Sequence, residues 1–102
     1  MTTRFTIFFA ESVREDFKAF RAYDRAVIFE AITTQLTHHP HVATRNRKLL
    51  RNLIPPFEAI PPIWQLRVGE FRIFYDVDEE TQRVYVRAIR RKPAHHDTEG
   101  IL

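Results

Sequence analysis

Residues 64–78 read WQLRVGEFRIFYDVD, and this stretch gives the clearest indication of the fold. Apolar and polar side chains alternate on both sides of Gly69-Glu70, which is the period-two pattern of two strands joined by a tight turn. The polar run 78–82 predicts a second turn, and the alternation resumes over residues 84–88. The second half of the chain is therefore expected to form three consecutive antiparallel strands.

The chain before this hairpin shows a strand and then helical spacing. Residues 5–10 (FTIFFA) are predicted as a strand, and Ser12 with Glu15 fits a capping box at the start of a helix. A second helix is expected over about 24–36, and Pro40 ends the helical pattern. Its apolar stripe would consist of Val27, Ile28, Ala31, Ile32 and Leu36.

Residues 42–62 have no clear period and contain four prolines. They predict a long surface loop with at most one helical turn, of the kind that is functional or mobile. The expected order is thus β-α-α-β-β-β in one domain, residues 1–102. The predicted class is α+β, with a helical hairpin packed on one face of a small antiparallel sheet.

Positive charge is unevenly distributed along the chain. The net charge is only +3, yet residues 45–72 hold six basic and two acidic residues, and residues 83–92 hold five basic and none acidic. Clustered arginine suits the phosphates of a nucleic acid or an acidic protein partner, although a solvated basic face would give the same composition.

The period of two predicts where these charges lie. If the strand faces of Trp64, Ile73 and Val84 contact the helices, the opposite face becomes a basic platform. Phe74 and Tyr85 on that face either stack bases or form a second apolar cluster. The polar members of the platform would be Gln65, Arg67, Arg72, Arg87 and Arg91.

Common enzyme signatures are missing from the sequence. There is no cysteine, no phosphate-binding glycine-rich loop and no His-Glu-x-x-His helix. His38, His39 and His41 suit an exposed loop better than a metal site, so no metal or other cofactor is expected. No apolar run is long enough to span a membrane and no signal peptide is recognisable, so we expect a cytoplasmic protein.

The segments WQLRVGEFRIFYDVD (64–78) and VYVRAIRRKPAHH (84–96) resemble the C-terminal hairpin and last strand of RelE/ParE-family toxins. The resemblance implies a type II toxin kept silent by an antitoxin protein. It implies a metal-independent endonuclease (mRNA interferase) that cleaves messenger RNA on the ribosome. Two alternatives remain open: an inhibitor of DNA gyrase, and a non-toxic member that only binds an antitoxin and helps it to repress DNA.

The resemblance also implies roles for single residues. Arg72 would stabilise the charged transition state, Arg67 would bind phosphate beside it, and Gln65 stands where RelE has a lysine. Arg91 and Lys92 would be the basic pair that ends the last strand. The alternative for the first two is a salt bridge with Glu70 or Asp76.

Cleavage by a 2′-OH also needs an acid and a base, which arginine rarely supplies. No tyrosine follows Tyr85. The resemblance implies His95 in this role, because a subset of the family looks like it ends K-P-x-H, which matches Lys92 to His95; His96 is in reserve and Glu99 is a weak third candidate. The alternative is that both histidines lie in a solvent-exposed tail. Further RNA contacts, or contacts with an acidic antitoxin, are expected from Arg45, Arg47, Lys48, Arg51, Gln65, Arg87 and His96.

Overall fold

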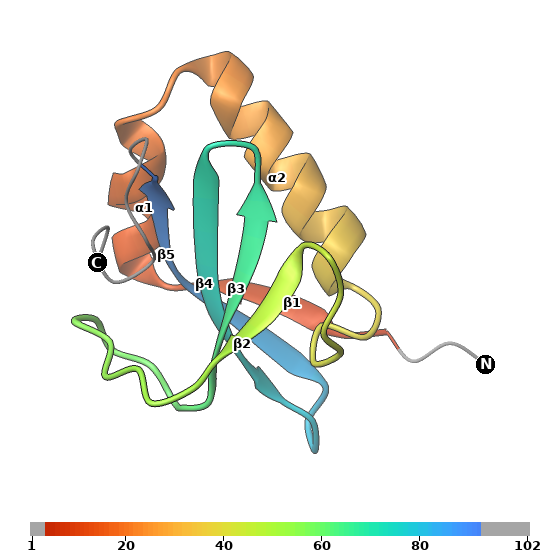
Figure 1. The fold of residues 1–102 in the computed structure, drawn as a ribbon. Helices are drawn as coiled ribbons and strands as arrows, with labels where there is room; N and C mark the ends of the chain where they lie inside the picture. Colours follow the sequence, from red (N-terminus) through yellow and green to blue (C-terminus); the bar gives the residue numbers. More distant parts are fainter. Residues whose placement is uncertain (1–3, 93–102) are drawn as a thin grey trace.

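The structure, a computed structural model that describes residues 4–92, consists of two helices packed on a five-stranded sheet (Figure 1). The elements are β1 (Thr6–Phe9), α1 (Glu11–Lys18), α2 (Ala22–Leu36), β2 (Arg47–Leu50), β3 (Ile63–Val68), β4 (Phe71–Asp78) and β5 (Arg83–Arg91). This confirms the α+β class and the helical hairpin. Within the described residues, no helix combines the length and the apolar character needed to cross a membrane.

The sheet differs from the expected one in two details. Its order is β1-β5-β4-β3-β2, and β1 runs parallel to β5, so the sheet is mixed and not wholly antiparallel. The second detail is β2, which pairs antiparallel with β3 inside the segment expected to be a loop. Four residues are too few to show a period of two, and β2 exists because it pairs with β3.

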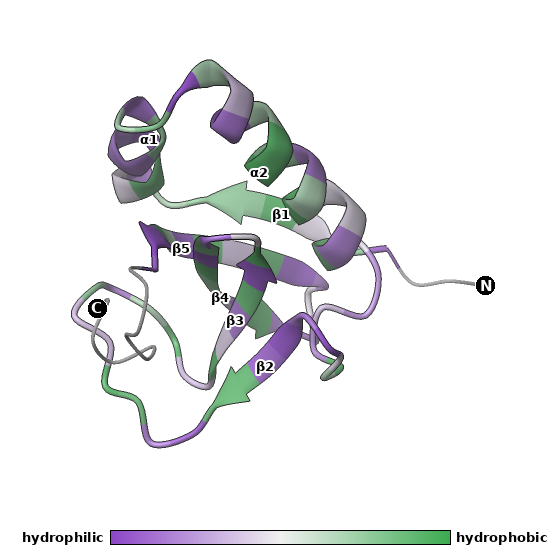
Figure 2. Cartoon of the chain, turned by 45° about the horizontal axis from the view of Figure 1, so that its top comes forward, coloured by the Kyte–Doolittle hydropathy of each residue, from purple (hydrophilic) through white to green (hydrophobic). Residues whose placement is uncertain are grey.

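Both helices lie on one side of the sheet (Figure 2). Ile28, Ile32 and Leu36 of α2 are fully buried there against the apolar faces of β4 and β5. Beneath α2, the Tyr75 hydroxyl donates a hydrogen bond to the Pro40 carbonyl at 2.7 Å. The turn that follows α2 is thereby attached to the centre of the sheet.

Two local features test the expected turn and cap. Gly69 has φ +56°, a left-handed conformation that glycine adopts without strain, and this confirms the tight turn between β3 and β4. The capping box is wrong. The N-cap of α1 is Ala10 without a side-chain hydrogen bond, and the Ser12 hydroxyl donates to the Arg87 carbonyl at 3.2 Å.

The sheet face opposite the helices is partly covered by the segment between β2 and β3. Phe74, fully buried, lies on this face with Ile63 and Ala88, and Phe57 packs on it with a ring-centroid distance of 5.9 Å. Phe74 is thus part of a second apolar cluster and has no exposed face for stacking a base. The other members of the cluster are Leu50, Leu53 and Ala59.

Candidate functional site

A polar recess lies on the open face, at the end of the sheet where β3 turns into β4. We call it the basic recess; its volume is about 510 Å³. Arg67 and Arg72 are cross-strand partners, and the Arg67 main-chain N–H donates to the Asn46 carbonyl at 2.8 Å. This bond places the residues before β2 beside the hairpin. The recess is lined by Arg45, Asn46, Arg67, Gly69 and Arg72.

Arg72 is the buried member of the basic recess, with 8% of its surface exposed. Its Nη1 donates to the carbonyls of Gly69 at 2.8 Å and Phe71 at 2.9 Å, which fixes the side chain. Burial lowers the pKa of the Arg72 guanidinium, and the nearby charge of Arg67 lowers it further. The two positive charges repel each other, and a bound anion would relieve this repulsion.

The described residues provide no carboxylate partner for the side chains of Arg45, Arg67 or Arg72. The salt bridges considered above for Arg67 and Arg72 are absent, because Asp76 pairs with Arg87 and Glu70 with Arg91. Three guanidinium groups therefore line one recess without a neutralising acid among residues 4–92. Such an arrangement can bind a phosphate through charge-assisted hydrogen bonds.

The two arginines of β5 that we expected on the open face behave differently. Arg87 Nε lies 2.6 Å from the Asp76 carboxylate, and the guanidinium covers the Tyr85 ring at 4.9 Å. Tyr85 also stacks on Phe8, with centroids 5.5 Å apart. The open face near Tyr85 is therefore occupied by an ion pair and two packed rings.

Arg91 lies on the other face of the sheet from the one predicted. It covers the Phe71 ring at 5.0 Å and pairs with Asp24 of α2 at 3.5 Å. The cause is a β-bulge: Phe74 pairs with Ala88 but Tyr75 with Val86, which leaves Arg87 as an extra residue. Beyond the bulge the alternation of β5 is reversed.

Because the alternation is reversed, Arg90 takes the place on the open face that was predicted for Arg91. Arg90 is the cross-strand partner of Arg72 and is bound by Asp16 of α1 at 3.0 Å. The main-chain N–H of Ile89 donates to the same carboxylate at 3.0 Å. The basic end of β5 is thus held by acidic side chains from both helices.

The remaining predicted contacts lie outside the basic recess. Arg47 lies on the helix side, where it donates to the carbonyls of Gln35 and Val42. Lys48 is exposed and is the cross-strand partner of Gln65, which is only 7% exposed. Arg51 is exposed in the turn after β2.

The strand end and the histidines complete the predicted set. The main-chain N–H of Lys92 donates to the Glu70 carbonyl at 2.7 Å, beside the hairpin turn. His95, His96 and Glu99 lie outside the described residues. Among residues 4–92, no group of three or more His, Cys, Asp or Glu side chains is arranged to hold a metal ion.

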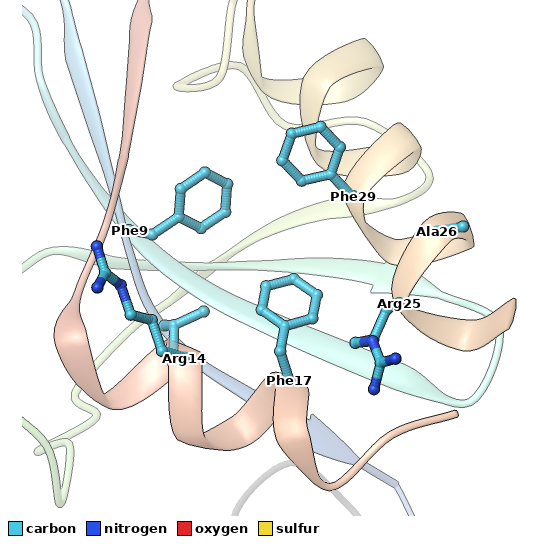
Figure 3. Close-up of a pocket in the computed structure, with 7 residues that line it drawn as sticks. Phe9, Arg14, Phe17, Arg25, Ala26 and Phe29 are labelled. Atoms are coloured by element: carbon cyan, nitrogen blue, oxygen red, sulfur yellow. The ribbon is translucent and has the colours of Figure 1, made fainter. Parts of the chain in front are cut away.

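A second cavity was not predicted from the sequence. It lies between β1, α1 and α2, has a volume of about 520 Å³ and is mainly apolar (Figure 3). An available signal was Phe29, which lies outside the predicted apolar stripe of α2 and is 53% exposed. We call this cavity the helical groove; it is lined by Phe9, Val13, Arg14, Phe17, Arg25, Ala26 and Phe29.

Comparisons with known proteins identify similar folds and the family of the chain. The fold is similar to the crystal structure of the RelBE2 toxin–antitoxin complex of Mycobacterium tuberculosis, with a TM-score of 0.72, 21% identity, and coverage of 90% of this chain and 95% of that chain. It is also similar to the archaeal RelE–RelB complex of Pyrococcus horikoshii, with a TM-score of 0.67, 12% identity, and coverage of 94% and 100%. No curated protein sequence matches significantly. Because the family model for the ParE toxin of the type II toxin–antitoxin system parDE matches residues 7–92, this chain belongs to that toxin family.

Proposed function

We propose that this toxin is an RNA endonuclease and that the basic recess binds the phosphate at which the RNA is cut. One observation carries the proposal: Arg45, Arg67 and Arg72 share the basic recess without a carboxylate among the described residues. Elsewhere at this end of the molecule arginine is paired with acid. A recess whose arginines have no acidic partner in the described part of the chain suits a polyanionic substrate.

The chemistry assigned to the basic recess is phosphoryl transfer within the RNA. The 2′ oxygen attacks the adjacent phosphorus, the bond from phosphorus to the 5′ oxygen breaks, and a 2′,3′-cyclic phosphate and a 5′-OH result. Arg72, oriented by two main-chain carbonyls, donates to the oxygens on which charge increases. Arg67 adds a second donor from the neighbouring strand.

Proton transfer requires another group, since arginine stays protonated. We assign it to His95, which would take the proton from the 2′-OH and return a proton to the leaving 5′ oxygen; His96 is the alternative. The substrate proposed is messenger RNA on the ribosome, with Lys48, Arg51 and Lys92 as further RNA contacts outside the basic recess. The controlling partner proposed is a cognate antitoxin.

The test is to induce the chain in a bacterial host and to map the 5′ ends of messenger RNA. Wild type should arrest growth and produce new 5′ ends in translated messages. Arg72→Ala should reduce cleavage by about 10²–10³-fold, the usual effect of removing one transition-state donor. Arg72→Lys should not restore it, because lysine lacks the planar fork.

The matched control is Arg83→Ala, which removes an exposed arginine at the other end of β5 and should leave toxicity unchanged. His95→Ala then tests the acid/base assignment. Growth arrest without new 5′ ends, but with loss of DNA supercoiling, would favour gyrase inhibition instead. Absence of any arrest would leave only an antitoxin-binding module.

A further inference from the structure

Asn46 contributes a neutral polar side chain to the basic recess. It lines the recess together with Arg45, Arg67 and Arg72. Its main-chain N–H and C=O are both hydrogen-bonded, whereas its side-chain amide has no hydrogen-bond partner within residues 4–92. The fold therefore uses the main chain of Asn46 and leaves the amide available for a ligand.

The sheet register places Asn46 on the open face, in line with two of these arginines. The pairing of β2 with β3 aligns Arg47 with Leu66, so Asn46, one residue earlier, stands opposite Arg67. The hydrogen bond from the Arg67 N–H to the Asn46 carbonyl at 2.8 Å continues this register. Arg67 is in turn the cross-strand partner of Arg72. Neighbouring strands lie about 4.8 Å apart, so the main chain of Asn46 lies about 10 Å from that of Arg72.

The turn before β2 holds the main chain of Asn46 in place. Thr44 Oγ1 accepts hydrogen bonds from the main-chain N–H groups of Asn46 at 3.3 Å and Arg47 at 3.1 Å. The Thr44 N–H donates to the Arg47 carbonyl at 2.9 Å, which closes the turn. A short side chain on a fixed main chain loses little conformational freedom when it binds a ligand. The amide is therefore well placed to contribute to selectivity.

The amide offers hydrogen-bonding groups that the arginines do not have. Arginine only donates, whereas an asparagine amide donates through its nitrogen and accepts through its oxygen. Adenine presents a donor, N6, beside an acceptor, N7, and asparagine matches this pair with a bidentate contact. Guanine presents two acceptors at the same edge, which suits arginine instead. Among the purines, the amide therefore favours adenine.

The basic recess also has room for a base beside the phosphate. Its volume of about 510 Å³ falls within the roughly 300–1,000 Å³ of typical small-molecule sites. A methyl group added at Gly69 would meet no described atom within 4 Å apart from its chain neighbours, so this wall of the recess is open. A phosphate bound between Arg67 and Arg72 leaves the side of the recess next to Asn46 for a base.

We propose that Asn46 determines which base the toxin prefers, by hydrogen-bonding an adenine next to the phosphate in the basic recess. The inference rests on RNA cleavage, the proposed function, and adds to it a preference for adenine at a position that flanks the cut. Asn46 is a specificity-determining residue in this account and takes no part in proton transfer.

The experiment maps new 5′ ends in messenger RNA after induction and compares the base frequencies on either side of the cuts. Wild type should favour adenine over guanine at one flanking position by at least about fivefold, the lower end of discrimination by a bidentate amide–base contact. Asn46→Ala should bring this ratio to about one, because the contact is lost. The matched control is Gln35→Ala, which removes a neutral amide from α2 on the other side of the sheet and should keep the wild-type ratio.

Asn46→Asp adds a test that a merely structural role would not pass. A carboxylate accepts hydrogen bonds but does not donate them, so the preference should move from adenine to cytosine, whose N4 amino group is a donor. The total number of cuts should fall as well, because the new carboxylate can pair with Arg67. Urea unfolding of Asn46→Ala should keep the wild-type midpoint, since no hydrogen bond of the described residues uses this side chain.

Unchanged base frequencies in both Asn46 variants would overturn the inference and leave the nuclease standing. A wild-type preference for a base other than adenine would overturn it too. So would a lowered unfolding midpoint in Asn46→Ala with all sites cut equally less often, which would make the residue structural. Absence of new 5′ ends in wild type is a different result, because it refutes the nuclease and the inference together.

Discussion

Asp76 is 3% exposed, and its carboxylate accepts hydrogen bonds from Arg87 Nε at 2.6 Å and from the main-chain N–H of Ile60 at 3.1 Å. A charge buried to this extent is costly unless it is paired, so Asp76 and Arg87 stabilise each other. Arg87 therefore contributes mainly to folding. Arg72 is bound by main-chain carbonyls and has no acidic partner between residues 4 and 92, so its charge is available for a ligand.

Tyr75 allows a prediction for stability at alkaline pH. Burial raises the pKa of Tyr75 well above its ordinary value, against a smaller opposing effect of the Arg47 charge. In the unfolded chain the phenol ionises near pH 10. The contribution of Tyr75 to the free energy of unfolding is therefore complete below about pH 10 and is lost as the pH rises further. Tyr75→Phe also removes the hydrogen bond to Pro40, which should cost about 1 kcal/mol at pH 7.

The measurement is urea unfolding of wild type and Tyr75→Phe between about pH 7 and 11. The stability difference should be constant up to about pH 9.5, and it should shrink and then reverse above about pH 10. The ionisation of the other tyrosines affects both proteins equally and does not change the difference in stability. A difference that does not change over the whole range would contradict the prediction.

At the scale of elements, the segment 51–62 acts as a cover for one end of the open sheet face. Phe57 packs on Phe74, whereas Ile54, three residues earlier, is 91% exposed. Phe57→Ala should lower the free energy of unfolding by about 1–2 kcal/mol, less than for a fully buried phenylalanine. Urea denaturation measures this, and limited proteolysis should show faster cleavage within the segment.

Ile54→Ala provides the matched comparison in the same segment. It should change stability by less than about 0.5 kcal/mol, because little of its side chain is buried. Equal effects of the two substitutions would mean that the segment does not use Phe57 as its anchor.

At the scale of the whole molecule, one main core joins both helices to the sheet. The radius of gyration is 12.9 Å, close to the roughly 13 Å typical of a folded domain of about 100 residues. We predict a single cooperative unfolding transition in calorimetry, with calorimetric and van't Hoff enthalpies that agree. Two separated transitions would show that the single-domain interpretation is wrong.

The two candidate surfaces are a consequence of this layered architecture. The sheet separates a basic recess on one face from an apolar groove among the helices on the other. The two surfaces therefore differ in chemistry, one being basic and the other mainly apolar.

Elements whose patterns are long and local could be predicted from the amino-acid sequence. The hairpin around Gly69, most of the α2 stripe and the third strand of the meander were predictable because each rests on side-chain period or turn chemistry within a few residues. Val27 is the exception in the stripe, because it is 38% exposed. The cross-strand pair Arg67 and Arg72 followed from the same hairpin register. The sequence was therefore sufficient to place these two arginines side by side on one face of the hairpin.

Features that depend on contacts between distant segments were set by the packing of the elements. Strand β2 forms because it pairs with β3, and the bulge at Arg87 reverses the alternation of β5, so that Arg90 and not Arg91 faces Arg72. The pairing of each arginine with Asp16, Asp24 or Asp76 likewise joins residues far apart in the chain. Periodicity indicates which side of its own element a side chain faces. Its tertiary contacts are set by how the elements pack against one another. Those contacts decide whether an arginine is paired with an acid or is free to bind phosphate.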